Sequence, residues 1–387
     1  MKIGIISLLP RLPWAGSEEL WAQMASAALE ERHEVAISML HHAKPRPKLD
    51  ALEKQGAQVL PRWRRRVPSA NSALAMILRR PVPWPPPRPL YSYKAIFDFK
   101  PDVVCISQGS TYDFIGDPDL QEHLARSKVP FTVVCQANDE GPLDESLREE
   151  ATSFFRAARH VAFVSQGNMQ VARRQLAHTI PNAIVVQNPV NLSDFRAVPW
   201  PEEEEVQWAC VARVDNLTKG QDVLFEALGR PQWSDRSWRL RLYGEGPDVA
   251  HLRDLSHLHG FAERIELCGQ VADVRNIWAR HHMLLLTSRK EGTPLALIEA
   301  LLCGRPALVT DVAGNAEWVE EGRTGFVAPA PTTPLIEDAL ERAWNSKSQW
   351  KEMGQRAHES ASTRFDRHAG RSLLRLLTKG TAPDPGF

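Results

Sequence analysis

The chain of 387 residues has no long apolar run, and no stretch approaches the ~20 apolar residues that a membrane-spanning helix needs. At the N-terminus Lys2 precedes IGIISLL, but this run is too short for a secretory signal. Pro10, Arg11 and Pro13 interrupt it, and no small-residue cleavage site follows. A first parallel strand explains the segment better. We therefore expect a cytoplasmic protein, either free or peripheral at the inner face of the membrane.

The chain also lacks net charge and metal-binding spacing. Its 47 Lys and Arg balance 47 Asp and Glu, so no global field favours nucleic acid as a partner. The cysteines are an odd five without metal or redox spacing: Cys105, Cys135, Cys210, Cys268 and Cys303. We expect reduced core cysteines and no metal site. The only D-x-D triplet, at residues 117–119, contains Pro118 and is expected to open a helix.

Strand-like apolar segments alternate with helical stretches along most of the chain. Examples are IGIISLL, VAISML, DVVCIS, FTVVCQ and HVAFVS in the first half, and VQWACVARV and HMLLLTS in the second. This alternation predicts an α/β fold with parallel sheets covered on both faces, whose ligands bind beyond the carboxyl ends of the strands. The length favours two domains, joined through the Pro- and acid-rich stretch around 188–205.

The most informative stretch runs from Ser288 to Ala328. Thr293 can cap the first amides of a helix, Pro294 suits the first helical position, and Gly304 with Pro306 supplies a stop, which predicts a helix of about ten residues. A carboxylate in so apolar a helix needs hydrogen-bond donors. For the glutamate in LALIEALLC, these are either the hydroxyls of a ligand or a cation such as Arg305, and the residues alone leave both open.

The loop before this helix favours an anion. Glu291, Gly292 and Thr293 bring a small flexible turn, free amides and the positive end of a helix dipole to one place, which suits a phosphate.

Two glutamates lie in the setting E-G-T-P-L-A-L-I-E-A-L-L-C-G-R-P, which is followed by T-D-V-A-G. This pattern resembles the signature of retaining family 4 glycosyltransferases of the GT-B fold. The resemblance implies that Glu291 lies at the transferred sugar and that Glu299 holds the ribose diol of the nucleotide. It also implies that the stretch between them faces the sugar and the diphosphate: Gly292, Thr293, Pro294 and Leu295.

Further site residues follow from the same resemblance. Arg213 and Lys219 correspond to cations that grip the diphosphate and stabilise the charge that grows as the sugar departs. Gly16, in the loop after the first strand, corresponds to a Gly-rich loop that reaches the diphosphate, although this chain has one Gly where many members have two. The turn at Gly269 corresponds to the place of the base.

The resemblance also implies the architecture: two Rossmann-like, doubly wound domains that face each other across a cleft. We expect an acceptor-side domain at 1–190, a linker at 191–205 and a nucleotide-sugar domain at 206–360. A final helix is expected from about His358 to Leu377. The segment 361–380 is expected to cross back onto the first domain. The nucleotide sugar is a substrate, and we expect neither a cofactor nor an essential metal.

The loop after FTVVCQ departs from the family, since many relatives have a histidine there. This chain has Gln136 and Asn138, which can hydrogen-bond a sugar hydroxyl but cannot act as a general base. Transfer remains feasible because the leaving phosphate can take the acceptor proton. We therefore expect a retaining glycosyltransferase with an unidentified acceptor, such as a glycan, a lipid-linked glycan or a small molecule, serving glycan, polysaccharide or glycolipid synthesis.

Three alternatives stay open. One is a nucleotide-sugar epimerase or hydrolase of the same fold, and another is a catalytically silent nucleotide-sugar binder. A nicotinamide dehydrogenase is the third, although GEGPD at 244–248 lacks the third glycine of a dinucleotide fingerprint.

A basic, Pro-rich segment at 44–100 has thirteen Lys or Arg against three acidic residues. Within it, SANSALAMILRR can form a short amphipathic helix. One hypothesis is a peripheral contact of residues 62–88 with an anionic membrane or acceptor. The other is an ordinary domain helix beside a solvated loop.

Overall fold

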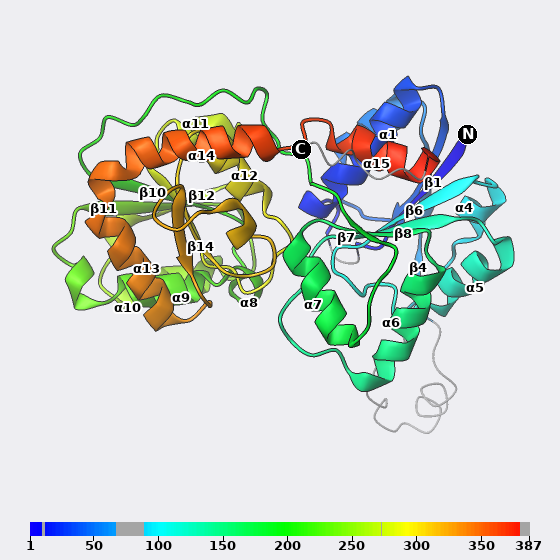
Figure 1. Cartoon of the computed structure of the whole chain (residues 1–387), viewed down its shortest axis with the longest axis horizontal. Coiled ribbons are helices and arrows are strands. Elements are labelled where there is room, and N and C mark those ends of the chain that lie inside the picture. Colours follow the sequence, from blue (N-terminus) through cyan, green and yellow to red (C-terminus); the bar gives the residue numbers. More distant parts are fainter. Residues whose placement is uncertain (10–11, 67–88, 272, 380–387) are drawn as a thin grey trace.

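The chain folds into two lobes, each built around a parallel sheet with helices on its faces (Figure 1). The structure is a computed structural model, and it describes residues 1–9, 12–66, 89–271 and 273–379. The predicted α/β class with two doubly wound sheets is confirmed.

The first lobe holds a seven-stranded sheet in the order β3-β2-β1-β6-β7-β8-β9. Its strands are β1 (Lys2–Ser7), β2 (Glu34–Leu40), β3 (Gln58–Arg62), β6 (Val103–Ser107), β7 (Phe131–Cys135), β8 (His160–Phe163) and β9 (Ala183–Val185). All neighbours pair in parallel, and the central strands are buried along their whole length. That burial explains their continuous apolar runs.

Helices cover both faces of this sheet. They are α1 (Glu19–Glu30), α2 (Pro47–Lys54), α4 (Lys94–Asp98), α5 (Pro118–Ser127), α6 (Glu145–Ala157) and α7 (Gln166–Leu176). The triplet at 117–119 opens α5 as predicted, because the Asp117 carboxylate accepts from the Leu120 amide. The side chain of Asp117 therefore has a structural partner.

The second lobe holds a six-stranded parallel sheet in the order β12-β11-β10-β13-β14-β15. The strands are β10 (Val206–Val211), β11 (Trp238–Tyr243), β12 (Ile265–Gly269), β13 (Met283–Leu286), β14 (Ala307–Thr310) and β15 (Gly325–Ala328). The main helices are α8 (Asn216–Lys219), α9 (Gln221–Leu228), α10 (Val249–Leu258), α11 (Val274–Trp278), α12 (Leu295–Leu302), α13 (Thr333–Asn345) and α14 (Trp350–Arg364).

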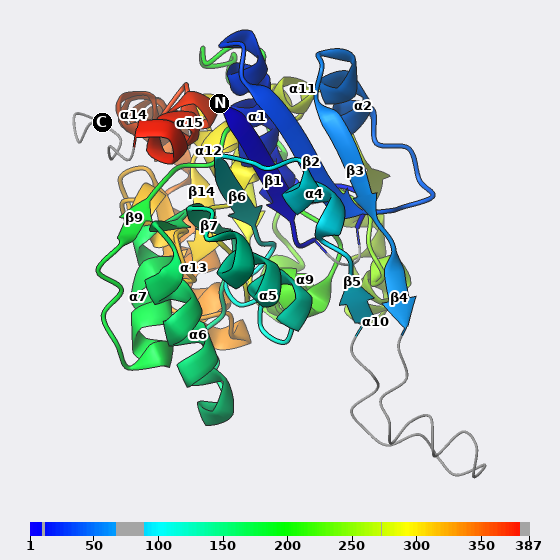
Figure 2. The same cartoon turned by 90° about the vertical axis from the view of Figure 1, so that its right-hand side faces the viewer.

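Part of the basic segment forms a small antiparallel pair, β4 (Arg64–Arg66) with β5 (Pro89–Tyr91), which extends from the first lobe (Figure 2). The helix predicted from SANSALAMILRR, and most of the proposed contact segment 62–88, lie outside the described residues. In the described part of the chain, no helix is both long and apolar enough to cross a membrane.

The stretch from 186 to 205 forms no helix or strand, yet it is packed. Val190 and Val198 are buried in the core of the second lobe. The guanidinium of Arg305, 1% exposed, donates to the carbonyls of Val198 and Pro199. Arg305 therefore holds this connection against the second lobe.

The chain ends in two helices where one was predicted at about His358–Leu377. α14 ends at Arg364, and Phe365 takes an extended backbone and packs into the second-lobe core. The Asp366 amide then donates to Gln187 Oε1 at 2.7 Å before α15 (Ala369–Lys379) begins. This break redirects the chain towards the other lobe.

α15 lies against α1 of the first lobe (Figures 1 and 2). Its four leucines are buried in the same core as the inner face of α1. A Cβ at Gly370 would come within 2.7 Å of the carbonyl carbon of Gln23, so glycine permits the close approach. The terminal helix thus belongs to the packing of the first lobe.

The lobes touch where the loops after β7 and β13 meet. The Asn138 amide donates to the Glu291 carbonyl at 3.0 Å, and the Thr293 hydroxyl donates to the Val164 carbonyl at 2.9 Å. A Cβ on Gly292 would lie 1.7 Å from the carbonyl oxygen of Gln136, so only glycine fits there. We call this contact the seam.

The amino end of α7 adds a further contact across the seam. The Glu317 carboxylate of the second lobe accepts from the amides of Gln166 at 3.3 Å and Gly167 at 2.6 Å. A carboxylate is stabilised there because the first amides of a helix lack intrahelical partners and carry the positive end of the helix dipole.

The carboxylate of Glu18 is buried in the first lobe, in the segment that follows β1. Glu18 is 1% exposed and accepts hydrogen bonds from Ser7 Oγ and from Trp21 Nε1, the latter at 2.9 Å. Burial raises the pKa of Glu18 to about 7, while bonds from Ser7, Trp21 and Ser17 and the charge of Arg62 lower it. The desolvation cost of the charged form exceeds these favourable contacts.

This burial predicts a pH dependence of stability. Folding raises the pKa of Glu18, so the native state holds this proton more tightly and loses stability as pH rises from about 4.5 through 7. The effect is on the order of 3 kcal/mol. We expect Glu18→Gln to raise the melting temperature relative to wild type more at pH 8 than at pH 5. The exposed Glu352→Gln serves as control. An equal offset for Glu18→Gln at both pH values would contradict the assignment.

The seam predicts that Gly292→Ala separates the lobes. The new methyl group would meet a main-chain oxygen, which cannot turn away as a side chain can. We expect a larger radius of gyration in small-angle X-ray scattering and a lower melting temperature. Gly109→Ala is the matched control, because its Cβ would meet only side-chain atoms of Leu9 at 3.3 Å and Asp113 at 3.5 Å. An unchanged radius of gyration for Gly292→Ala would show that the contact is dispensable.

Candidate nucleotide-sugar site

The candidate site lies at the carboxyl ends of the strands of both sheets. β13 delivers the loop 287–294, β7 delivers Gln136 and Asn138, and β1 leads to Gly16. Parallel strands place such loops at one edge of a sheet, and here the two edges meet at the seam. Residues far apart in the sequence therefore share one site.

The helix at its centre, α12, begins differently from the prediction. It spans Leu295–Leu302, eight residues, and Pro294 occupies the N-cap position without a capping side chain. Thr293, predicted to cap the helix, donates its hydroxyl to Val164 of the first lobe instead. The first intrahelical hydrogen bond runs from the Leu297 amide to the Pro294 carbonyl at 3.1 Å. The amides of Leu295 and Ala296 lie before Leu297 and have no carbonyl one turn earlier, so the amino end of α12 can bind an anion.

Glu291 is held by two neighbours. It is 5% exposed, and its Oε1 accepts from Ser288 Oγ at 2.7 Å and lies 2.6 Å from Lys219 Nζ. Ser288 is fully buried, and its carbonyl accepts from Thr310 Oγ1 at 2.7 Å. These contacts fix the Glu291 carboxylate beside the seam.

The two cations predicted to grip a diphosphate differ in setting. Lys219, at the end of α8, forms the ion pair with Glu291, and its side chain is 21% exposed. Arg213 follows β10, is 45% exposed and lies 3.5 Å from Asp215. The structure therefore brings Lys219 to Glu291, whereas Arg213 stands at the surface with its carbonyl bonded by Gln221.

Glu299 is buried on the inner side of α12, 3% exposed. Its Oε1 accepts from the Asn191 amide at 2.9 Å, and burial raises its pKa, with the charge of Glu19 adding to the rise and that of Lys48 opposing it. Lys48 Nζ in turn lies 2.6 Å from Glu19. Glu299 thus meets groups from the first lobe and the connecting segment.

The alternative of a core pair between Glu299 and Arg305 does not match the structure. The guanidinium of Arg305 donates to main-chain carbonyls only, among them those of Trp278 and His281, both at 2.8 Å. The guanidinium also lies over the Trp200 ring, with Cζ 5.1 Å from the ring centroid. Burial lowers the pKa of Arg305 to about 10.

The two glycines predicted at the site fall in different places. Gly16 lies across from α12, because its Cβ would come within 3.4 Å of Leu295 Cδ1. Gly269 ends β12, the edge strand, which β11 and β10 separate from β13. It adopts a φ of 68°, and its carbonyl accepts from the Gly244 amide at 2.7 Å. Gly16 therefore lies beside the start of α12, whereas two strands separate the strand of Gly269 from β13.

Asn138 uses its side chain within the first lobe. Its Nδ2 donates to Gln175 Oε1 at 2.9 Å, and its Oδ1 accepts from the Asp139 amide at 2.9 Å. Gln175 is fixed in turn by Tyr112 and by the carbonyls of Asp139 and Gly141. The main-chain amide of Asn138 is the part that reaches the second lobe.

Several residues at the site were not predicted from the sequence. Ser288 was expected at the cleft, as the start of the most informative stretch, but its hydrogen bond to Glu291 was not predicted. Lys48 and Glu19 gave no signal, because their relation to Glu299 depends on how the lobes pack. Glu317 follows the T-D-V-A-G segment, but its role in capping α7 arises only across the seam.

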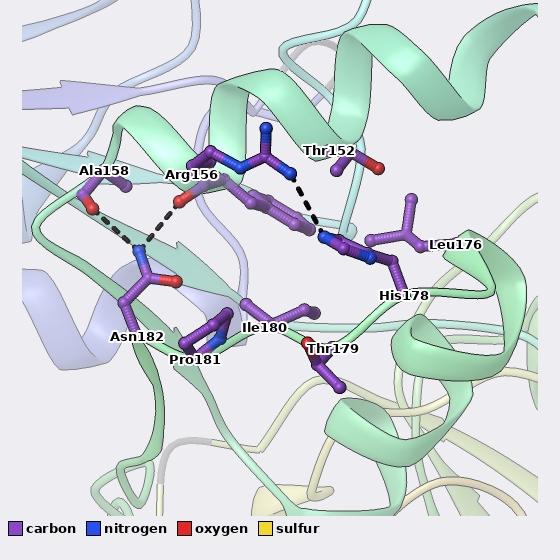
Figure 3. Close-up of a pocket in the computed structure, with 10 residues that line it drawn as sticks. Thr152, Arg156, Ala158, Leu176, His178, Thr179, Ile180, Pro181 and Asn182 are labelled. Carbon is purple, nitrogen blue, oxygen red and sulfur yellow. Dashed lines mark hydrogen bonds between the residues drawn. The ribbon is translucent and has the colours of Figure 1, made fainter.

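A separate hollow of about 400 Å³ lies in the first lobe (Figure 3). It lies near the amino ends of β8 and β9, which is the edge opposite the seam, and includes Phe155, Leu176 and Ile180. There Arg156 Nη2 lies 3.2 Å from His178 Nε2.

A second hollow, of about 420 Å³, lies between α7 and the loop after β14, with Arg174 and Asp311 among its lining residues. The described residues contain no cluster of three His, Cys, Asp or Glu side chains placed to hold a metal ion.

Comparison with known proteins matches the second lobe to a family. Residues 205–346 match the family described as glycosyl transferases group 1. An exopolysaccharide phosphotransferase of Streptomyces coelicolor is 33% identical over 149 residues, which are 38% of this chain and 16% of that protein. The N-acetyl-alpha-D-glucosaminyl L-malate synthase of Bacillus anthracis is 31% identical over 128 residues, 33% of each chain. The match thus spans a third or less of these two relatives.

Solved structures extend the likeness to both lobes. HepE of Anabaena, in complex with UDP, superimposes with a TM-score of 0.72 at 16% identity, covering 98% of this chain and 100% of the other. A glycosyltransferase from Rickettsia africae gives a TM-score of 0.72 at 15% identity, with 98% and 100% covered. The GT-B fold predicted from the sequence is thereby confirmed. Residues 205–346 match the glycosyl transferases group 1 family, and the chain as a whole has the GT-B fold.

Proposed function

We propose that this protein is a retaining glycosyltransferase that moves a sugar from a nucleotide-diphosphate donor to an acceptor. The observation that carries the proposal is the pair of buried carboxylates at α12. Glu291 and Glu299 lie on either side of an uncapped helix end, inside the segment that matches the family. Burying two carboxylates costs free energy unless cations or hydrogen-bond donors, from the protein or from a ligand, stabilise their charge.

In this proposal the donor lies along α12. The amides at Gly292, Thr293 and Leu295 face the diphosphate and sugar, and Pro294 shapes the turn. Glu299 holds the ribose diol, whose hydroxyls can donate to its carboxylate oxygens beside Asn191. The remaining contacts proposed for the donor are Gly16 at the phosphates, Gly269 at the base and Asn138 beside the sugar.

The charge that develops on the leaving diphosphate needs cations. Lys219 stands beside Glu291, and Arg213 is exposed enough to turn towards a ligand. Hydrogen bonds to charged groups contribute roughly 1.5–3 kcal/mol each. With two cations and a helix amino end available, we propose that neither a metal ion nor a cofactor is essential.

The acceptor proton has no histidine to receive it near Asn138, so we propose that the departing phosphate takes it. In this step the bond between the anomeric carbon and the phosphate oxygen breaks, and the acceptor oxygen bonds that carbon from the same face while its proton passes to the departing phosphate. Attack from the face of departure retains the configuration. We further propose an acceptor such as a glycan, a lipid-linked glycan or a small molecule, in glycan, polysaccharide or glycolipid synthesis. We place the protein in the cytoplasm, with a peripheral contact of residues 62–88 at the inner membrane face.

We also propose the division into an acceptor-side domain at 1–190, a linker at 191–205, a donor domain at 206–360 and a returning segment at 361–380. The packing of α15 on α1 supports a segment that returns to the first domain, and the hydrogen bonds from Arg305 to Val198 and Pro199 support the linker.

A nucleotide-sugar epimerase or hydrolase and a silent binder use the same donor contacts, so assays separate them from a transferase. An epimerase or hydrolase converts the donor without any acceptor. A silent binder is stabilised by donor and converts nothing.

A thermal-shift screen tests the donor site. The panel contains UDP, GDP, ADP and TDP with their sugars, and NAD tests the dehydrogenase alternative. A ligand at 100 times its dissociation constant should add about 2.7 kcal/mol of stability. We expect one nucleoside diphosphate and its sugar to raise the melting temperature. A response to none of them, or to NAD alone, would overturn the proposal.

Two substitutions in the same assay separate the roles of the carboxylates. Glu299→Ala should weaken nucleotide binding, because it removes the acceptor for the ribose hydroxyls. Glu291→Ala should reduce turnover of the donor more than it reduces affinity for free nucleotide. The exposed Glu352→Ala is the control. Equal losses of nucleotide binding in both site variants would contradict these roles.

A further inference from the structure

The turn at Gly16 is held by a buried carboxyl group. Glu18 ends the short 3₁₀ turn that Gly16 begins, and this turn leads directly into α1. Its side chain is 1% exposed and accepts from Ser7 Oγ, at the end of β1, and from Trp21 Nε1, on α1, the latter at 2.9 Å. The Glu18 carboxyl therefore ties the turn to a strand end and to the helix that follows.

The same turn faces the second lobe. A Cβ on Gly16 would lie 3.4 Å from Leu295 Cδ1, at the start of α12. The carbonyl of Ser17 accepts from Ser107 Oγ, at the end of β6, at 3.5 Å, and Ser17 Oγ lies 3.5 Å from Glu18 Oε2. Donor phosphates at Gly16 would thus bind to a turn whose last residue is the buried carboxyl group.

Charged and titratable groups reach Glu18 from several elements. Arg62, at the end of β3, lowers the pKa of Glu18 through its charge, and its guanidinium donates to main-chain carbonyls of β1 and β2. Cys105, on β6, is a buried thiol whose pKa is raised to about 12, so it stays neutral. Glu19, the next residue, is paired with Lys48 of α2 at 2.6 Å. Burial outweighs the charge of Arg62 and raises the pKa of Glu18 to about 7.

An anion at Gly16 shifts this balance further towards the neutral carboxyl. A diphosphate is negatively charged, and a like charge close to a carboxyl group disfavours its ionised form. The neutral form can keep both contacts, because one oxygen still accepts from Trp21 Nε1 and the O–H can donate to Ser7 Oγ. Protonation thus removes the repulsion without releasing the turn.

We propose that Glu18 is a positioning residue that holds the Gly16 turn against the donor diphosphate as a neutral carboxyl, so that donor binding takes up a proton from solvent. The inference rests on the proposed function and adds a proton-linked control to the same site. Its sign follows from linkage. Affinity for the donor is full below about pH 6, where Glu18 already carries the proton, and falls as pH rises through 7.

Isothermal titration calorimetry in two buffers of different ionisation enthalpy measures the proton uptake. The probe is UDP-glucose, or GDP-, ADP- or TDP-glucose if that donor is the one that binds. Both phosphates of a nucleotide sugar are esterified twice, so neither titrates near neutral pH, whereas a terminal phosphate titrates at about pH 6. We expect uptake of about half a proton or more per donor at pH 8 and almost none at pH 5.5. The dissociation constant should rise about threefold or more from pH 7 to pH 8.

Glu18→Gln separates this proton from all others. Glutamine keeps the shape of the neutral carboxyl group and cannot ionise, so we expect the variant to bind the nucleotide sugar about equally well at pH 6 and pH 8. Glu299 on α12 also has a raised pKa, but any proton that it exchanges is still exchanged in this variant. The difference in uptake from wild type therefore belongs to Glu18. The exposed Glu352→Gln is the control and should take up protons as wild type does.

Two further variants complete the test. Glu18→Ala removes the side chain that holds the turn, so we expect weaker binding of the nucleotide sugar at both pH values. If Glu18→Gln does not fold, Glu18→Met, which is uncharged and of similar length, takes its place in the comparison of proton uptake.

Three results would overturn the inference. One is a wild-type protein that binds the nucleotide sugar without proton uptake at pH 8, which leaves the proposed function standing. Another is equal uptake by wild type and Glu18→Gln, which assigns the proton to a different group. The third is a loss of binding in folded Glu18→Gln at both pH values, which means that the ionised carboxylate is required. Wild type that binds no nucleotide sugar would instead remove the proposed function, and the inference with it.

Discussion

The uncapped amino end of α12 is the feature on which the site depends. The sequence predicts that the Thr293 hydroxyl caps this helix. In the structure that hydroxyl donates across the seam to the Val164 carbonyl. This single hydrogen bond has two effects. It leaves the first amides of the helix free, and it ties the loop before the helix to the first lobe. The same residue thereby exposes an anion site and positions it against the other half of the molecule.

The two carboxylates on either side of this helix end, Glu291 and Glu299, have different surroundings. Glu291 is charge-paired with Lys219 and fixed by Ser288, so its position is set before any ligand arrives. Glu299 has a main-chain amide as its hydrogen-bond donor and a pKa raised by burial, so it gains most from further donors. This difference supports assigning Glu291 to the reacting sugar and Glu299 to the recognition of hydroxyls on the nucleotide.

The local parts of the fold could be predicted because burial on both faces leaves a direct trace in the sequence. The run HMLLLTS marks β13, and its apolar neighbours mark the rest of the sheets. The helix predicted at about 358–377 was wrong in its middle, because Phe365 is held in the second-lobe core and Asp366 bonds to Gln187. Both contacts are distant in sequence, so helical periodicity gives no sign of them.

The same limit applies to the site. The E-G-T-P motif indicated which residues of the second lobe matter, since its residues are adjacent along the chain. The positions of Lys48 and Glu19 near Glu299 depend on how the lobes meet, and no local pattern encodes that. Even Arg305, which lies six residues after Glu299 in the sequence, donates to carbonyls of the connecting segment and not to Glu299.

The central claim is that the amino end of α12, between Glu291 and Glu299, binds a nucleoside diphosphate. Hydrogen–deuterium exchange with and without saturating UDP, GDP, ADP or TDP tests it most directly. The account predicts slower exchange in the peptide covering residues 291–299 with the nucleotide that binds. Protection confined to the first lobe, for example around the hollow between α6 and β9, with 291–299 unchanged, would contradict it.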